Sequence, residues 1–102
     1  MTYAIQYLPQ AVENIKNIKD YISQDNPPAA QKLTDTIKTR IESLQTMPRK
    51  YEEYSENPAF RKIVVGSYLV FYKIDEAKKV VKIHRVLHGK QNISKMMNLV
   101  EN

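Results

Sequence analysis

The side chains best suited to chemistry are concentrated between Phe60 and Asn92. Two histidines in this segment, His84 and His88, are separated by three residues, and histidine is the side chain that titrates closest to neutral pH. Eight basic residues lie in the same segment, and five of them are candidates for this chemistry: Arg61, Lys62, Lys82, Arg85 and Lys90. A histidine beside cations that hold a phosphate could transfer a proton during phosphodiester chemistry. Binding of an acidic partner, with no reaction, is the other chemistry that this set supports.

Each of these residues also has an ordinary structural explanation. His88 precedes Gly89 and could simply end a strand, and His84 could be a surface residue of the same strand. Tyr68 and Tyr72, which we also consider as binding residues, belong to a residue type that favours strands for steric reasons. The basic residues could be solvated surface groups.

Several site classes are not expected. Two histidines without further ligands do not make a metal site, and two glycines are too few for a phosphate-binding or dinucleotide-binding loop. The absence of cysteine excludes disulfides and suits a reducing cytoplasm. No apolar run approaches the ~20 residues that cross a bilayer. We therefore expect one domain over residues 1–102, in the cytoplasm, with no cofactor, no metal and no membrane contact.

The charge balance favours an acidic partner. The 16 Lys and Arg residues exceed the 11 Asp and Glu residues, which gives a net charge of +5 and an isoelectric point of about 9.4. Nucleic acid and an acidic protein segment both fit this excess, and charge alone does not choose between them. Many basic proteins bind neither.

Four segments have the pattern of strands. Residues 3–7 alternate apolar and polar, and they are followed later by Phe60–Val65, Tyr68–Ile74 and Val80–Leu87. The run Tyr68–Ile74 is apolar on both faces apart from Lys73, which is typical of the middle of a sheet. Gly66 and Ser67 predict a two-residue hairpin turn, and residues 75–79 predict a second short hairpin.

Two amphipathic helices are predicted between the first and second strands. The first begins at Pro9 and has an apolar stripe formed by Ala11, Ile15, Ile18 and Ile22. The second begins at Asn26 and Pro27, ends at Met47 and Pro48, and has its own stripe: Ala30, Leu33, Ile37, Ile41 and Leu44. The short connection predicts an antiparallel hairpin. Residues 49–59 predict an exposed loop tethered by Tyr51 and Tyr54, and residues 93–102 a tail or short helix.

The predicted fold is therefore α+β, with the order β-α-α-β-β-β and the helical hairpin packed on one face of a small, mainly antiparallel sheet. Strict alternation predicts that one set of strand residues faces the helices: Leu69, Phe71, Val81, Ile83 and Leu87. We expect these to pack on Ile15, Ile18, Ile37 and Ile41. A second set would then lie on an open face: Tyr68, Tyr72, Lys82, His84 and His88. Arg85 breaks the alternation, and a bulge or a snorkelling side chain would explain it.

The element order, the segment FRKIVVGSYLVFYKID and the ending KIHRVLHGKQN resemble the RelE/ParE superfamily of bacterial type II toxins. The resemblance covers nearly the whole chain. It implies a toxin that arrests growth and that is held inactive in a hetero-oligomer by a cognate antitoxin, usually an acidic or amphipathic chain that wraps around it. We expect acidic antitoxin residues to pair with Arg61, Lys62 and Arg85.

One branch of this superfamily, the RelE-like toxins, cuts mRNA on the ribosome. Its members typically have an arginine at the start of the central strand, another after the final Gly-Lys, and a tyrosine near the C-terminus. The corresponding residues here are Tyr68, Gln91 and approximately Met97, so that set is absent. If the chain is nevertheless a metal-independent endoribonuclease, we expect His88 to transfer the proton, with Arg61 and Lys82 as cations.

The ParE-like branch inhibits DNA gyrase and has no established hydrolytic machinery. The segments NPPAAQKL and LQTMP at the ends of the second helix resemble this branch, and RVLHGKQN is similar to its ending VLHGRRD, with Gln91 and Asn92 in place of Arg and Asp. Gyrase inhibition is therefore the preferred function, and ribosome-dependent mRNA cleavage is the alternative. The expected binding residues are Arg61, Lys62, Tyr68, Tyr72, His84, Arg85 and Lys90.

Overall fold

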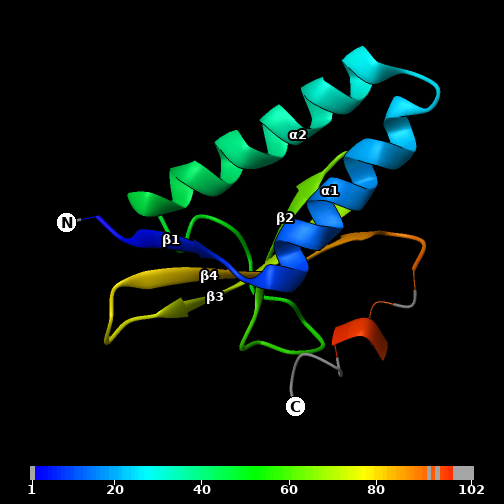
Figure 1. The fold of residues 1–102 in the computed structure, drawn as a ribbon. Coiled ribbons are helices and arrows are strands. Elements are labelled where there is room, and N and C mark those ends of the chain that lie inside the picture. The colour runs from blue at the N-terminus through cyan, green and yellow to red at the C-terminus, as the bar shows by residue number, and fades with distance from the viewer. Residues whose placement is uncertain (1, 92, 94, 98–102) are drawn as a thin grey trace.

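The computed structural model describes residues 2–91, 93 and 95–97 (Figure 1). The elements are β1 (Ala4–Tyr7), α1 (Pro9–Ser23), α2 (Pro27–Glu42), the short 3-10 helix η1 (Ser43–Gln45), β2 (Arg61–Val65), β3 (Tyr68–Asp75) and β4 (Val80–His88). The predicted α+β order is confirmed. Within the predicted C-terminal tail, Ile93 and residues 95–97 are helical, and the rest of that tail lies outside the described residues.

Local sequence signals explain where the two helices begin. Pro9 is the first residue of α1, where its missing N–H costs no hydrogen bond. At α2, the Asn26 side chain accepts a hydrogen bond from the Ala29 N–H at 3.1 Å, and Pro27 occupies the first helical position. None of the helices among the described residues is both long and apolar enough to cross a membrane.

The sheet has the strand order β1-β4-β3-β2. β1 pairs with β4 in parallel, and the other two pairings are antiparallel hairpins. The first hairpin turns at Gly66, whose φ of 58° is accessible to glycine at no steric cost. The second hairpin turns through Lys79, which adopts a φ of 55°, and the Asp75 side chain accepts a hydrogen bond from the Lys78 N–H at 3.0 Å.

Both long helices cover the same face of the sheet (Figure 1). The core on this side, the helix-side core, consists of residues from every element except β1: Ala11, Ile37, Ile41, Leu44, Ile63, Val65, Val70, Tyr72, Val81, Ile83 and Val86. The prediction that Val81 and Ile83 pack beneath the helices is confirmed. The same prediction is wrong for Leu69, Phe71 and Leu87, which belong to a separate cluster. Because β3 is apolar on both faces, its pattern does not reveal which face meets the helices.

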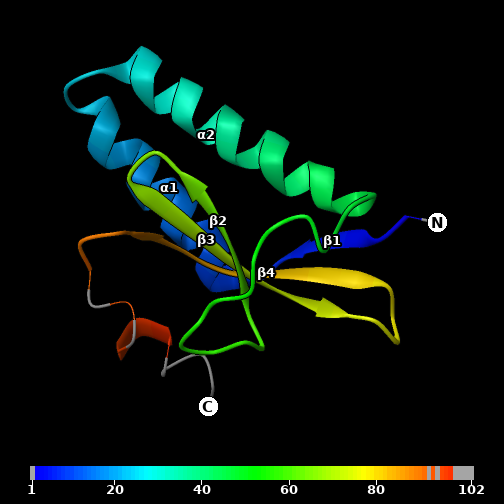
Figure 2. The ribbon, with the colours of Figure 1, turned by 180° about the vertical axis from the view of Figure 1, so that it is seen from behind.

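The opposite face of the sheet is partly covered rather than open. The loop after η1 crosses it, and the C-terminal helical turn lies beside that loop (Figure 2). A second cluster is buried there: Tyr54, Phe60, Phe71, Leu87 and Met97. The Tyr54 ring meets the edge of Phe71 with 5.1 Å between centroids, so the predicted tether at Tyr54 is confirmed. The loop is a cover for this face, because its aromatic residues bury the apolar residues that the helices leave exposed.

Candidate functional site

The face of the sheet away from the helices carries most of the basic residues singled out above. We call it the basic face and define it by Lys62, Lys73, Lys82, His84 and Arg85. Residues opposite each other in a sheet share a face, and Lys62 and Arg85 are each paired with Phe71, while Lys73 is paired with Lys82. The basic residues therefore surround the second apolar cluster.

A β-bulge at His84 creates this arrangement. Phe71 pairs with Arg85, but the next residue of β3, Tyr72, pairs with Ile83, so that His84 is the extra residue on β4. One unpaired residue reverses the faces of all the residues that follow it. The bulge suggested by Arg85 is therefore confirmed. Its consequence is that Val86 and His88 lie on the helix side, whereas Arg85 and Leu87 lie on the basic face.

The cations of the basic face are held by nearby groups. Lys82 Nζ lies 3.9 Å from Asp75 Oδ2, and Lys62 Nζ lies 3.8 Å from Glu52 Oε1. Lys73 Nζ lies 4.5 Å from the centroid of the Phe60 ring. The Arg85 guanidinium donates a hydrogen bond to the His84 carbonyl at 3.0 Å, and its burial lowers the pKa of Arg85 below the ordinary value. The face is thus a preorganised cationic surface around an aromatic centre.

His84 lies within this surface but its Nε2 atom is buried. Its ring meets the edge of Phe60, with 5.1 Å between centroids and an interplanar angle of 89°. A proton donor or acceptor must come within hydrogen-bonding distance of its substrate. The Nε2 atom of His84 does not meet that condition in this conformation.

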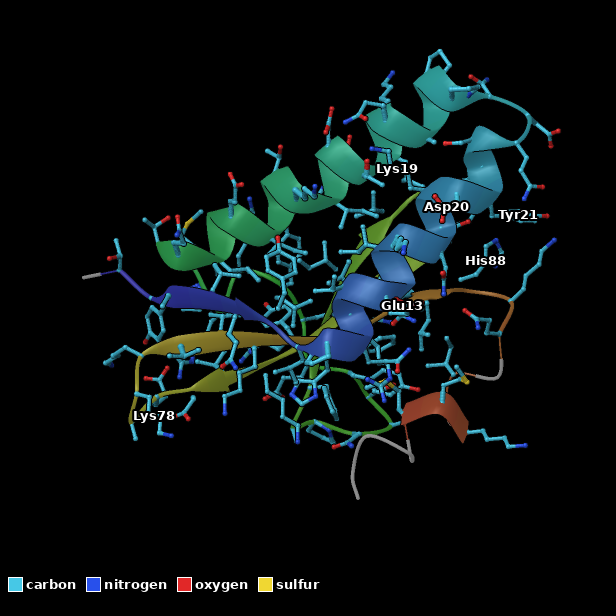
Figure 3. The ribbon with its side chains drawn as sticks, viewed as in Figure 1. Glu13, Lys19, Asp20, Tyr21, Lys78 and His88 are labelled. Atoms are coloured by element: carbon cyan, nitrogen blue, oxygen red, sulfur yellow. The ribbon has the colours of Figure 1, made fainter. Side chains whose placement is uncertain are left out.

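His88 lies on the helix side, near the C-terminal half of α1 (Figure 3). Its ring meets the edge of Tyr68 at 5.0 Å between centroids, and its Nδ1 atom accepts a hydrogen bond from the Lys90 N–H at 3.0 Å. The predicted grouping of His88 and Tyr68 on one face is therefore confirmed, as is the proximity of Lys90. Their predicted convergence with Lys82 and His84 is wrong, because the bulge places those residues across the sheet.

Arg61 and Tyr72 have structural contacts on the helix side. Tyr72 is fully buried, and its hydroxyl donates a hydrogen bond to the Pro48 carbonyl at 2.8 Å. Burial raises the pKa of Tyr72 to about 12. Arg61 donates a hydrogen bond to the Tyr51 carbonyl at 2.7 Å and lies 3.8 Å from Glu53. The predicted exposure of Tyr72 on an open binding face is therefore wrong.

Within residues 2–91, 93 and 95–97, no group of three or more His, Cys, Asp or Glu side chains could hold a metal ion. The arrangement instead offers two separate surfaces for recognition. One is the basic face, and the other is the pocket beside His88.

Residues 5–93 match the family model described as the ParE toxin of the type II toxin–antitoxin system parDE. The chain belongs to the ParE toxin family. No curated protein sequence matches it closely. Among solved structures, the chromosomal ParDE system from P. aeruginosa is similar, with a TM-score of 0.74 and 18% identity over 85% of this chain and 96% of that chain.

RelE toxins share the fold of this ParE-family chain. A mutant of the E. coli toxin RelE in the free state has a TM-score of 0.72 and 15% identity, over 99% of this chain and 98% of that chain. The RelBE2 toxin–antitoxin complex from Mycobacterium tuberculosis has a TM-score of 0.62 and 18% identity, over 86% of this chain and 99% of that chain. At these identities the likeness shows the fold.

The sequence did not predict the roles of Lys73, a residue of the basic face, and of Phe60, which contacts this face. Lys73 interrupts an otherwise apolar strand, and that interruption was the available signal. Phe60 contacts both Lys73 and His84 and thereby organises the face. The position of Phe60 next to Arg61 in the sequence does not indicate these two contacts, because both depend on the pairing of β3 with β4.

Proposed function

We propose that this ParE-family toxin arrests bacterial growth in the cytoplasm by binding and inhibiting DNA gyrase, and that it transfers no proton in doing so. The observation that supports this proposal is that neither histidine is placed to transfer a proton among the cations of the basic face. His88 lies across the sheet from Lys82 and Arg85, and the Nε2 atom of His84 is buried. Among the described residues, neither histidine presents a free imidazole edge to the basic face.

RNA cleavage needs a proton-transfer group and a cation on the same phosphate. Met97 stands approximately where RelE-like toxins have a tyrosine, and it is buried beneath the basic face with an exposure of 2%. A thioether does not transfer protons. The family match to ParE and this geometry support the same function.

The experiment is a direct comparison of the two targets with purified toxin. We expect the toxin to abolish ATP-dependent supercoiling of relaxed plasmid by gyrase, and to leave mRNA on programmed ribosomes uncut. The proposal fails if supercoiling is unaffected at toxin concentrations that stop growth. A Phe71→Ala variant, which removes a buried core residue, is the control for loss of fold.

Ribosome-dependent mRNA cleavage is the second candidate. The observation in its favour is the cluster of cations around His84 on the basic face. The fold also superposes on that of the free RelE mutant over nearly the full length of the chain. If this function holds, movement of the Phe60 side chain would have to expose His84. His84→Gln should then abolish cleavage, whereas His88→Ala should preserve it.

The ion pairs within the chain indicate which cations are available to bind an antitoxin. Lys62 and Arg61 have carboxylate neighbours in their own chain, so they are poor partners for the antitoxin. A groove of about 420 Å³ between α1 and α2 has Tyr7, Val12 and Ile15 among its lining residues. Three lysines also line it: Lys16, Lys19 and Lys38.

These lysines have no ion pair within the part of the chain that the structure describes. Figure 3 shows Lys19 between the two helices. We propose that an amphipathic, acidic antitoxin segment binds in this groove. Antitoxin affinity should fall as salt rises. A Lys38→Glu variant should bind more weakly, while the Lys32→Glu variant, which makes the same charge change on α2 outside the groove, should not.

A further inference from the structure

The pocket beside His88 has an unusual balance of hydrogen-bonding groups. It has a volume of about 670 Å³ and lies between α1 and the end of β4. The polar side chains used below are Asn14 and Tyr21 from α1, Tyr68 from β3, and His88, Lys90 and Gln91 from the end of β4. Figure 3 shows Tyr21 and His88 on the same side of the molecule.

Three of these side chains already use their acceptor atom on the backbone of β4 or the residues just after it. Asn14 Oδ1 accepts from the Val86 N–H at 3.1 Å, and Gln91 Oε1 accepts from the His88 N–H at 2.7 Å. His88 Nδ1 accepts from the Lys90 N–H at 3.0 Å. In each case the atom that remains is a donor: the two amide NH₂ groups and, in the neutral ring, Nε2–H.

The remaining side chains add further donors. Lys90 contributes an ammonium group, and it has no ion pair within the described residues. Tyr68 and Tyr21 each carry a hydroxyl that can donate a hydrogen bond. Asn17 also lines the pocket, and its amide brings one acceptor as well as a donor, as do the tyrosine hydroxyls. Donors still outnumber free acceptors, and Lys90 makes the pocket positively charged. Its complement is a ligand group that only accepts hydrogen bonds and carries negative charge, because such bonds are the strongest that these donors can make.

We propose that this pocket binds the carboxylate of an Asp or Glu side chain in an acidic segment of a partner protein. The choice of a protein over a nucleic acid follows from the other lining residues. Ile18 and Val86 give the pocket an apolar part suited to the side chain next to the carboxylate. A nucleic acid backbone requires a row of cations, whereas Lys90 is the single Lys or Arg among the described residues that line this pocket.

This inference goes beyond the proposed function. It holds whether the toxin inhibits gyrase or cleaves mRNA, because it rests on the donor groups beside His88 and not on the basic face or the groove between the helices.

The test is an NMR titration of ¹⁵N-labelled toxin with the peptide acetyl-Ala-Leu-Asp-Leu-Ala-amide and with its Asn counterpart. We expect the Asp peptide to shift the side-chain amide signals of Asn14 and Gln91. We also expect it to bind about tenfold or more tightly than the Asn peptide, since only the Asp peptide makes charge-assisted hydrogen bonds.

Two variants separate recognition from folding. Asn14→Asp keeps the acceptor for the Val86 N–H but replaces the donor with a negative oxygen, and Lys90→Gln removes the cation. Each variant should bind the Asp peptide about tenfold or more weakly than the native chain does. Lys78→Gln is the matched control, because it makes the same charge change at the hairpin tip, far from His88 in Figure 3. If Asn14→Asp does not fold, Gln91→Glu serves instead, since it keeps the acceptor for the His88 N–H.

Three outcomes would overturn the proposal. One is equal binding of the Asp and Asn peptides, and another is no shift with either. The third is that the oligonucleotide pentathymidylate shifts the same signals while the Asp peptide does not, which would assign the pocket to nucleic acid.

Discussion

Replacing Tyr72 with phenylalanine removes one hydroxyl group from the helix-side core and nothing else. In the native chain this hydroxyl donates a hydrogen bond to the Pro48 carbonyl at 2.8 Å, and the residue is fully buried. The variant loses that bond and leaves the carbonyl without its donor. We expect the free energy of unfolding at pH 8 to fall by about 1–2 kcal/mol.

The same replacement should have a smaller effect at high pH. The pKa of Tyr72 is raised from 10.0 to about 12, because burial disfavours the phenolate. Below pH 10 the hydroxyl is protonated in both the folded and the unfolded chain, so its hydrogen bond makes its full contribution to stability. Between about pH 10 and about pH 12 the unfolded chain loses the proton while the folded chain keeps it, so the native protein loses about 1.4 kcal/mol per pH unit.

The measurement is urea unfolding of the native chain and Tyr72→Phe at pH 8 and pH 11. The difference in stability should shrink by about 1.4 kcal/mol over this range, so that at pH 11 the two proteins differ by no more than about 0.6 kcal/mol. The remaining tyrosines are common to both proteins and cancel. Tyr21→Phe is the control, because Tyr21 is 71% exposed and should show no such change. A difference that stays constant with pH would refute the assignment of a buried, hydrogen-bonded hydroxyl.

Three further predictions concern stability and mechanism. Phe71→Ala should lower the free energy of unfolding by about 3–5 kcal/mol in chemical denaturation, because a fully buried ring is lost from the second cluster; an unchanged midpoint would contradict this. The pKa of Glu76 is lowered by hydrogen bonds from Tyr3 and Arg49, so stability should fall as the pH drops below about 4.5, and Glu76→Gln should flatten this decline in an acid titration. His88→Ala should remain toxic on induction in bacteria, whereas a nuclease that used His88 would lose about two orders of magnitude or more of cleavage.

Much of the architecture could be predicted because its signals are local. The positions where the two helices begin, Pro9 and Asn26–Pro27, depend on groups within one turn. The hairpin at Gly66 depends on one backbone angle. The same is true of the two apolar stripes, which recur at the helical period. The family resemblance depends on the order of these elements, and the match to ParE over residues 5–93 confirmed it.

The location of the candidate sites was harder to predict from the sequence. Tyr72 was predicted on an open face and is buried beneath the helices, because a strand that is apolar on both sides gives no indication of its orientation. The loop over residues 49–59 is mostly exposed and tethered by Tyr54, as predicted, but the sequence did not indicate that it covers the second face of the sheet. Which apolar residues such a loop covers depends on long-range contacts.

The sequence by itself determined the elements, their order, the charge excess and the presence of histidines and cations near the end of β4. Only the tertiary structure decided which of these residues share a surface. The physical reason is the bulge at His84, where β4 has one extra residue that no residue of β3 opposes. Side chains in a strand alternate with a period of two, so a single extra residue reverses every position after it. That reversal separates His88 from Lys82 and His84, and it is set by the pairing between strands, which the pattern along one strand does not contain.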